Sequence, residues 1–144
     1  MRAPPNRNPR TGGVDAATFL LLLLLLAAPA MALSRLAPGI DWLLLAGGPL
    51  TASFFTWLAY WSDKRRAEAG EWRLPEATLH LGELIGGWPG AFLAQRYYHH
   101  KTAKLSYQIV FWMIVLLHEY VALDFLLGWK LARALVALGQ AQIA

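Results

Sequence analysis

Residues 84–104, LIGGWPGAFLAQRYYHHKTAK, decide how the chain is arranged, because their two halves have opposite character. The first half is apolar but carries three glycines and a proline, the residues that weaken a helix most. The second half is basic and contains two adjacent histidines. The apolar half is therefore either a broken helix that turns back, or a continuous helix that packs closely and is followed by a loop in water.

The rest of the chain is dominated by apolar blocks, which indicate an integral membrane protein. Of the 144 residues, 57% are hydrophobic and only 15% are charged. Long apolar blocks cover residues 16–33, 40–61 and 105–127. At ~1.5 Å per residue, helices of this length match a hydrocarbon core of ~30 Å. We predict an all-α membrane bundle with three spanning helices and, at residues 77–94, a segment broken by glycine and proline.

The charge distribution and the absence of known motifs limit the classes of function that the chain can have. The net charge of +4 comes from lysines and arginines that flank the apolar blocks. This placement indicates membrane topology and contact with anionic lipid rather than with nucleic acid. The chain has no cysteine, which excludes disulfides and thiolate metal sites. No serine-hydrolase, zinc-protease, P-loop or dinucleotide-binding motif occurs. We therefore expect no cofactor, and a binding or accessory role rather than an enzyme.

The same patterning divides the chain into four regions. Residues 1–15 have no apolar period and are predicted to form a disordered tail. Residues 16–33 are predicted to be an N-terminal transmembrane helix. The arginines before the leucine run and the small residues around Pro29 would also suit a cleaved signal peptide. Residues 40–130 are predicted to form the membrane core, and residues 131–144 a C-terminal helix or tail.

The distribution of basic residues favours a re-entrant segment. If residues 77–94 turn back, ten of the 13 lysines and arginines lie on one side of the membrane and three on the other. If the segment spans, the division is nine to four. Because basic loops are retained in the cytoplasm, we favour re-entry, with the N-terminus on the cytoplasmic side of a bacterial inner membrane.

Local chemistry at residues 82–94 is compatible with both arrangements. Pro89 has no N–H to donate to the carbonyl of Ile85, so a tight turn is expected among the structural residues Gly86, Gly87, Pro89 and Gly90. In the competing arrangement, a kinked but continuous helix presents small residues every four positions, at Gly82, Gly86, Gly90 and Ala94. Such a stripe permits close contact between membrane helices.

Five short motifs occur in order across the second half of the chain. They are Asp63-Lys64, then Trp72-Arg73-Leu74-Pro75-Glu76, then Gly86-Gly87 with Gly90, then His100-Lys101-Thr102, then Lys104. Over about residues 57–120 this pattern resembles the DUF1294 family, small bacterial and archaeal membrane proteins without an assigned function. The chain departs from the family pattern at His99, where arginine is more usual, and it carries an additional N-terminal apolar block.

The resemblance implies a shared core of one helix, a basic loop, the glycine-broken segment, a second basic loop and a final helix that begins near an aromatic residue. It also implies that both basic loops face the same side. Some relatives carry a cold-shock domain that binds nucleic acid, and this domain is absent here. The family supplies no reaction and no ligand.

The basic loops supply a first set of candidate binding residues. Lys64, Arg73, His100, Lys101 and Lys104 would form a cationic cluster for anionic lipid headgroups if the loops lie on one side. The alternative is structural: Lys64 anchors a helix end beside Asp63, and the histidines belong to a solvated loop. A second copy of the chain or another membrane protein could also bind this face.

A second set of candidates lies within the apolar segments. Glu76, His80 and Glu83 share one helix face, and His118 and Glu119 lie near the middle of the last apolar block. Ionisable groups in a membrane are costly and often carry protons or metals. A small transporter or a proton relay is therefore the alternative function. The structural interpretation is that these groups face the interface or bond across the bundle.

Overall fold

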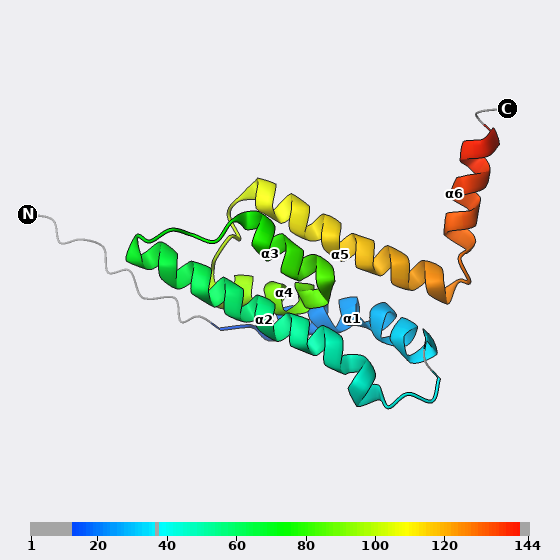
Figure 1. The fold of residues 1–144 in the computed structure, drawn as a ribbon, viewed down its shortest axis with the longest axis horizontal. Coiled ribbons are helices and arrows are strands. Elements are labelled where there is room, and N and C mark those ends of the chain that lie inside the picture. Colours follow the sequence, from blue (N-terminus) through cyan, green and yellow to red (C-terminus); the bar gives the residue numbers. More distant parts are fainter. Residues whose placement is uncertain (1–12, 37, 142–144) are drawn as a thin grey trace, which may run out of the picture.

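The protein is a helical bundle whose described residues contain no strand. The computed structural model describes residues 13–36 and 38–141. Its elements are α1 (Ala16–Leu36), α2 (Trp42–Ala69), α3 (Glu76–Gly82), η1 (Glu83–Gly87), α4 (Trp88–Tyr98), α5 (Leu105–Leu126) and α6 (Lys130–Ala141) (Figure 1). The all-α prediction is confirmed. Most of the tail predicted at residues 1–15, and residues 142–144 of the predicted C-terminal tail, lie outside the described residues.

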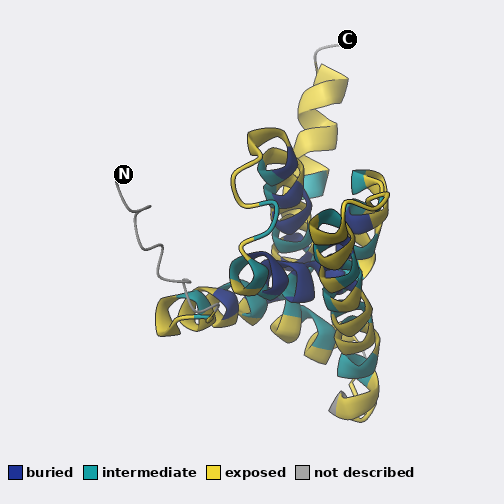
Figure 2. Cartoon of the chain, turned by 90° about the vertical axis from the view of Figure 1, so that its left-hand side faces the viewer, coloured by how far each residue is buried: buried dark blue, intermediate teal, exposed yellow. Residues whose placement is uncertain are grey.

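Three of these helices have the length and composition of membrane spans. They cover Ala16–Leu36, Leu43–Ala69 and Leu105–Leu126, as the apolar blocks predict. Large apolar side chains cover their outward faces: Leu24 is 71% exposed, Leu44 76% and Met113 63%. Buried residues are confined to the inward faces (Figure 2). An apolar surface this extensive is unsuited to water and fits a membrane protein.

Local chemistry explains where α2 and α4 begin and end. Asp41 precedes α2, and its carboxylate accepts a hydrogen bond from the Leu43 N–H at 2.9 Å. Gly70 ends α2 in the left-handed conformation, with φ of 69°. Pro89 is placed in the first turn of α4, where a backbone N–H would have no partner within the helix. His99 ends α4 with φ of 47°.

The segment from α3 to α4 is a helical hairpin, not one continuous helix. At Gly86 the backbone has φ of 116°, a conformation that favours glycine, and the chain reverses direction there (Figure 1). The two ends of the hairpin meet, because Lys101 Nζ lies 2.9 Å from Glu76 Oε1. The chain therefore turns at these glycines and does not continue as one helix.

Close packing against α2 holds the hairpin in place. A Cβ atom on Gly90 would lie 2.0 Å from the Ser53 carbonyl oxygen, and one on Gly87 would lie 2.0 Å from Thr56 Oγ1. These glycines let the hairpin backbone approach α2 as closely as a small-residue stripe does in membrane helices. The packing residues are Gly82, Gly87 and Gly90, not the regular four-residue stripe, because the turn at Gly86 shifts the register.

Candidate functional site

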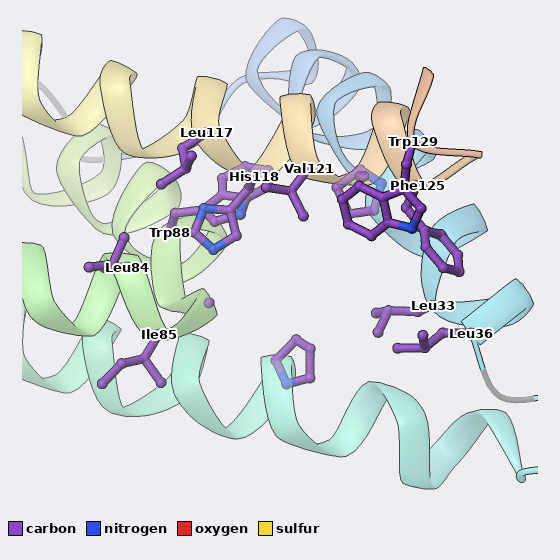
Figure 3. A pocket seen from close by; sticks show the side chains of 15 residues that line it. Leu33, Leu36, Leu84, Ile85, Trp88, Leu117, His118, Val121, Phe125 and Trp129 are labelled. Carbon is purple, nitrogen blue, oxygen red and sulfur yellow. The ribbon is translucent and has the colours of Figure 1, made fainter. Parts of the chain in front are cut away.

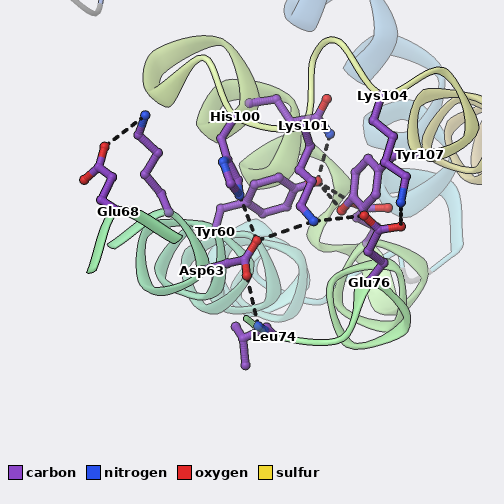
Figure 4. Close-up of polar contacts among 12 residues, drawn as sticks. Tyr60, Asp63, Glu68, Leu74, Glu76, His100, Lys101, Lys104 and Tyr107 are labelled. Atoms are coloured by element: carbon purple, nitrogen blue, oxygen red, sulfur yellow. Dashed lines mark hydrogen bonds and ion pairs between the residues drawn. The ribbon is translucent and has the colours of Figure 1, made fainter. Parts of the chain in front are cut away.

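Five polar residues from α2, α3 and the second basic loop meet where the two basic loops come together. We call them the loop cluster (Asp63, Glu76, His100, Lys101 and Lys104). Asp63 is fully buried. Its carboxylate accepts from the Leu74 N–H at 2.9 Å and lies 2.7 Å from His100 Nε2. Asp63 therefore joins α2 to both loops (Figure 4).

The lysines of the second loop bind the start of α3. Lys101 Nζ and Lys104 Nζ donate to the two oxygens of Glu76 at 2.9 and 2.8 Å. These bonds hold the pKa of Glu76 down at about 2. Lys101 Nζ also lies 3.6 Å from Asp63. Two of the predicted binding lysines thus have carboxylate partners in this structure.

The remaining predicted cations line a cleft beside the loop cluster. This basic cleft has a volume of about 480 Å³ and is lined by Lys64, Ala67, Glu68, Arg73, Glu76 and residues 99–104. Lys64 pairs with Glu68 at 3.1 Å rather than with the neighbouring Asp63. Arg73 is exposed and forms no ion pair among the described residues. All five predicted headgroup-binding residues therefore line one cleft.

A second polar group lies deeper in the bundle, and we call it the glutamate cluster (Tyr60, His80, Glu83, Gln95 and Tyr107). Glu83 is fully buried, and its Oε1 lies 2.6 Å from the Tyr60 hydroxyl and 2.9 Å from the Tyr107 hydroxyl. His80 Nδ1 lies 2.7 Å from Glu83 Oε2. Gln95 Nε2 donates to the Tyr60 hydroxyl at 2.8 Å. Four different helical segments thus surround one carboxyl group.

Gln108 connects the two clusters. Its Nε2 donates to Gln95 Oε1 at 2.6 Å and to the Lys101 carbonyl at 3.0 Å. Lys101 Nζ lies over the Tyr107 ring, 5.4 Å from its centroid. A continuous set of polar groups therefore leads from the basic cleft to Glu83.

The other predicted intramembrane residues lie apart from both clusters. His118 is hydrogen-bonded to the Ile114 carbonyl of its own helix, at 2.8 Å. It borders an apolar cavity of about 550 Å³ that also touches Gly86 and Trp129 (Figure 3). Glu119 Oε1 is buried without a hydrogen-bond partner among the described residues. Asp124 caps α6, accepting from Leu131 and Ala132 N–H groups. The structure therefore does not bring His118 and Glu119 to Glu83.

The motifs that carry the resemblance supply every residue of the loop cluster, the turn at Gly86 and most of the basic residues of the cleft. Residues 53–107 match the DUF1294 family model. The family is described as a protein of unknown function. No curated protein and no solved structure matches the chain. The DUF1294 segment runs from the middle of α2 to the start of α5, so it contains the hairpin, both basic loops and every residue of the glutamate cluster.

The sequence predicts His80 beside Glu83 but not the other members of the glutamate cluster. Tyr60 and Tyr107 were not singled out, and Gln95 carried no signal because a lone glutamine in an apolar helix is unremarkable in sequence. Two features of the sequence point to the tyrosines. Tyr107 is the aromatic residue that the DUF1294 pattern places near the start of the last helix. Tyr60 precedes Asp63 by one helical turn on α2, so both face the same neighbours.

Proposed function

We propose that this protein is a non-enzymatic membrane protein that binds the phosphate group of an anionic lipid in the basic cleft. The observation that carries the proposal is the convergence on one cleft of basic residues from α2 and from both loops: Lys64, Arg73, His100, Lys101 and Lys104. Lysine and arginine side chains at this density attract phosphate-bearing headgroups.

The dimensions of the hairpin support a re-entrant segment. Its arms, α3 with η1 and then α4, contain 12 and 11 residues. At ~1.5 Å per residue each arm reaches about half of a ~30 Å hydrocarbon core. Re-entry puts both basic loops at one membrane surface, and the excess of positive charge there makes that surface the cytoplasmic one.

Aromatic residues near the cleft support a location at headgroup depth. Trp72 is 92% exposed and directly precedes Arg73. Trp61 lies near the end of α2, with the Arg65 guanidinium 4.7 Å from its ring centroid. Exposed tryptophans are typical of the interface between headgroups and acyl chains. The cleft would therefore open where lipid phosphates are found.

A relay across the whole membrane is less well supported. Hydrogen-bonded polar groups lead from the cleft to Glu83, but in the described part of the chain no hydrogen bond continues to His118. The alternative function would need a second polar path through the apolar half of the bundle. Headgroup binding needs only the residues that already line the cleft.

The test is lipid retention by the purified full-length protein. Native mass spectrometry after exchange into mixed vesicles should show phosphatidylglycerol retained in preference to phosphatidylcholine. Arg73→Gln combined with Lys104→Gln should weaken retention roughly thirtyfold, because each cation near an anionic surface contributes about 1 kcal/mol and 1.4 kcal/mol is about tenfold. Retention of the two lipids to the same extent would overturn the proposal.

The matched control removes equal charge from the other end of the bundle. Lys130→Gln combined with Arg133→Gln changes the net charge by the same amount at α6, which lies away from the cleft. Inorganic phosphate should compete only weakly, since a lipid is also held by its acyl chains. Loss of retention in this control, or full displacement by inorganic phosphate, would show that the cleft is not a lipid site.

A further inference from the structure

Glu83 is a buried acid whose surroundings are neutral, and nothing in headgroup binding uses it. It is fully buried between α2, α4 and α5. Among the described residues its only ion-pair partner is His80. A buried carboxylate without a lysine or arginine partner is strongly disfavoured unless it is protonated or its charge is compensated.

The number of contacts around Glu83 can be compared with the number of protons available to form hydrogen bonds. Three oxygens form a triangle: Glu83 Oε1 lies 2.6 Å from the Tyr60 hydroxyl and 2.9 Å from the Tyr107 hydroxyl, and the two hydroxyls are 2.6 Å apart. With an ionised carboxylate, two tyrosine protons must serve three contacts. With a proton on Oε1, Glu83 donates to Tyr107, Tyr107 donates to Tyr60, and Tyr60 donates to Glu83, so every contact is a hydrogen bond.

The remaining contacts are compatible with this protonated state. Gln95 Nε2 occupies the second lone pair of the Tyr60 oxygen. Neutral His80, with its proton on Nδ1, donates to Glu83 Oε2 at 2.7 Å. The His80 ring is stacked on Tyr107, with centroids 4.2 Å apart, and its side chain is 16% exposed. His80 is therefore the member of the glutamate cluster that joins Glu83 to the outside.

We propose that Glu83 is a proton-binding site, loaded from the face of the basic loops through His80. In the loading step, the outer nitrogen of His80, Nε2, takes a proton from water. The Nδ1 proton then passes to Glu83 Oε2, and His80 is left neutral with its proton on Nε2. Rotation of the carboxyl then moves its proton to the side of the tyrosines. His80 turns towards water, gives up its Nε2 proton and takes one on Nδ1, which restores its hydrogen bond to Glu83 Oε2. No other reactant is consumed, and the reverse steps release the proton.

The charges nearest to the glutamate cluster all lie on its loop side. Asp63 follows Tyr60 by one turn on α2, Glu76 precedes His80 by one turn on α3, and Lys101 lies over the Tyr107 ring. The group on α4, Gln95, is neutral. Proton exchange is thus expected with the loop face alone, and the proposal does not depend on headgroup binding.

Infrared spectroscopy of the full-length protein in lipid nanodiscs tests the site directly. A protonated carboxyl has a C=O stretching band that an ionised one lacks. One such band should diminish as pH rises, shift in D₂O, and be missing in Glu83→Gln. In Glu119→Gln, the matched control in a spanning helix, the Glu83 band should remain. No protonated carboxyl band at any pH, or the absence of any band that is lost in Glu83→Gln, would overturn the proposal.

Two further variants keep the test independent of how Glu83→Gln folds. Tyr107→Phe removes one hydrogen bond to the carboxyl and should move the frequency of the same band without abolishing it. His80→Phe should slow the D₂O shift roughly a hundredfold, within the range that positioned acid–base groups contribute, while the band itself persists. Exchange at the wild-type rate in His80→Phe would contradict the assigned entry route.

Discussion

Asp63 shows how one side chain can hold the loop end of this bundle together. Its buried carboxylate serves the backbone of the first loop and the imidazole of the second. Asp63→Ala would leave the Leu74 N–H and His100 without their acceptor. We expect a loss of about 1–3 kcal/mol or more in the free energy of unfolding, since buried groups left unpaired carry that cost. Unfolding in mixed detergent micelles would measure it.

The matched control for Asp63 is Glu68. It is 63% exposed, and its ion pair with Lys64 on the surface of α2 is of the kind that contributes about 0–1 kcal/mol. Glu68→Ala should therefore leave the unfolding transition almost unchanged. Equal losses in the two variants would mean that the contacts of Asp63 do not stabilise the fold.

Glu76 gives the loop cluster a dependence on pH. Its pKa falls from 4.5 to about 2, chiefly because Lys104 and Lys101 donate hydrogen bonds to its carboxylate. A pKa lowered on folding contributes stability that is fully present above the unfolded pKa and is lost as pH falls through the folded one. The wild type should thus lose this contribution between about pH 4.5 and about pH 2. Unfolding curves of wild type and Glu76→Gln should converge across that window; a constant difference would contradict it.

At the scale of elements, the hairpin depends on glycines that have two different roles. Gly86 supplies the positive φ of the turn, and Gly90 lets α4 touch the α2 backbone. Gly90→Ala should cost about 1–3 kcal/mol, as overpacking does, because the new methyl group would meet the Ser53 carbonyl. Gly47→Ala, in α2 with open space around it, should be neutral or stabilising by up to about 1 kcal/mol. Thermal unfolding of both variants compares the two effects.

Element by element, the sequence predicts what depends on composition and local geometry. Runs of leucine and aromatic residues predict α1, α2 and α5, and the Gly-Gly-Trp-Pro-Gly stretch predicts the turn. The sequence does not predict which side chains from distant positions come into contact. Asp63 bonds to His100 across 37 positions, and Tyr60 to Tyr107 across 47. Such pairs are set by the angle at which the hairpin packs on α2, which no periodic pattern encodes.

At the scale of the whole molecule, the two ends of the bundle differ in character. The basic cleft, the loop cluster and the access to Glu83 lie at one end, whereas the apolar cavity, the connection from α1 to α2 and α6 lie towards the other (Figure 1). Lipid binding and proton loading would therefore both take place at one membrane surface. For both to take place at one surface, residues 76–98 must enter the membrane and return on the same side.

The absence of cysteine makes that requirement measurable. Three single-cysteine variants report on which side of the membrane a position lies in intact, oriented vesicles. They are Glu71→Cys in the first basic loop, Thr102→Cys in the second, and Ile40→Cys before α2. A membrane-impermeant maleimide should label Glu71→Cys and Thr102→Cys from the same side and Ile40→Cys from the opposite side, because α2 crosses between them. If residues 76–98 instead crossed the membrane, Thr102→Cys would be labelled together with Ile40→Cys. In that case the two loops could not share a cleft, and the headgroup proposal would fail with the topology.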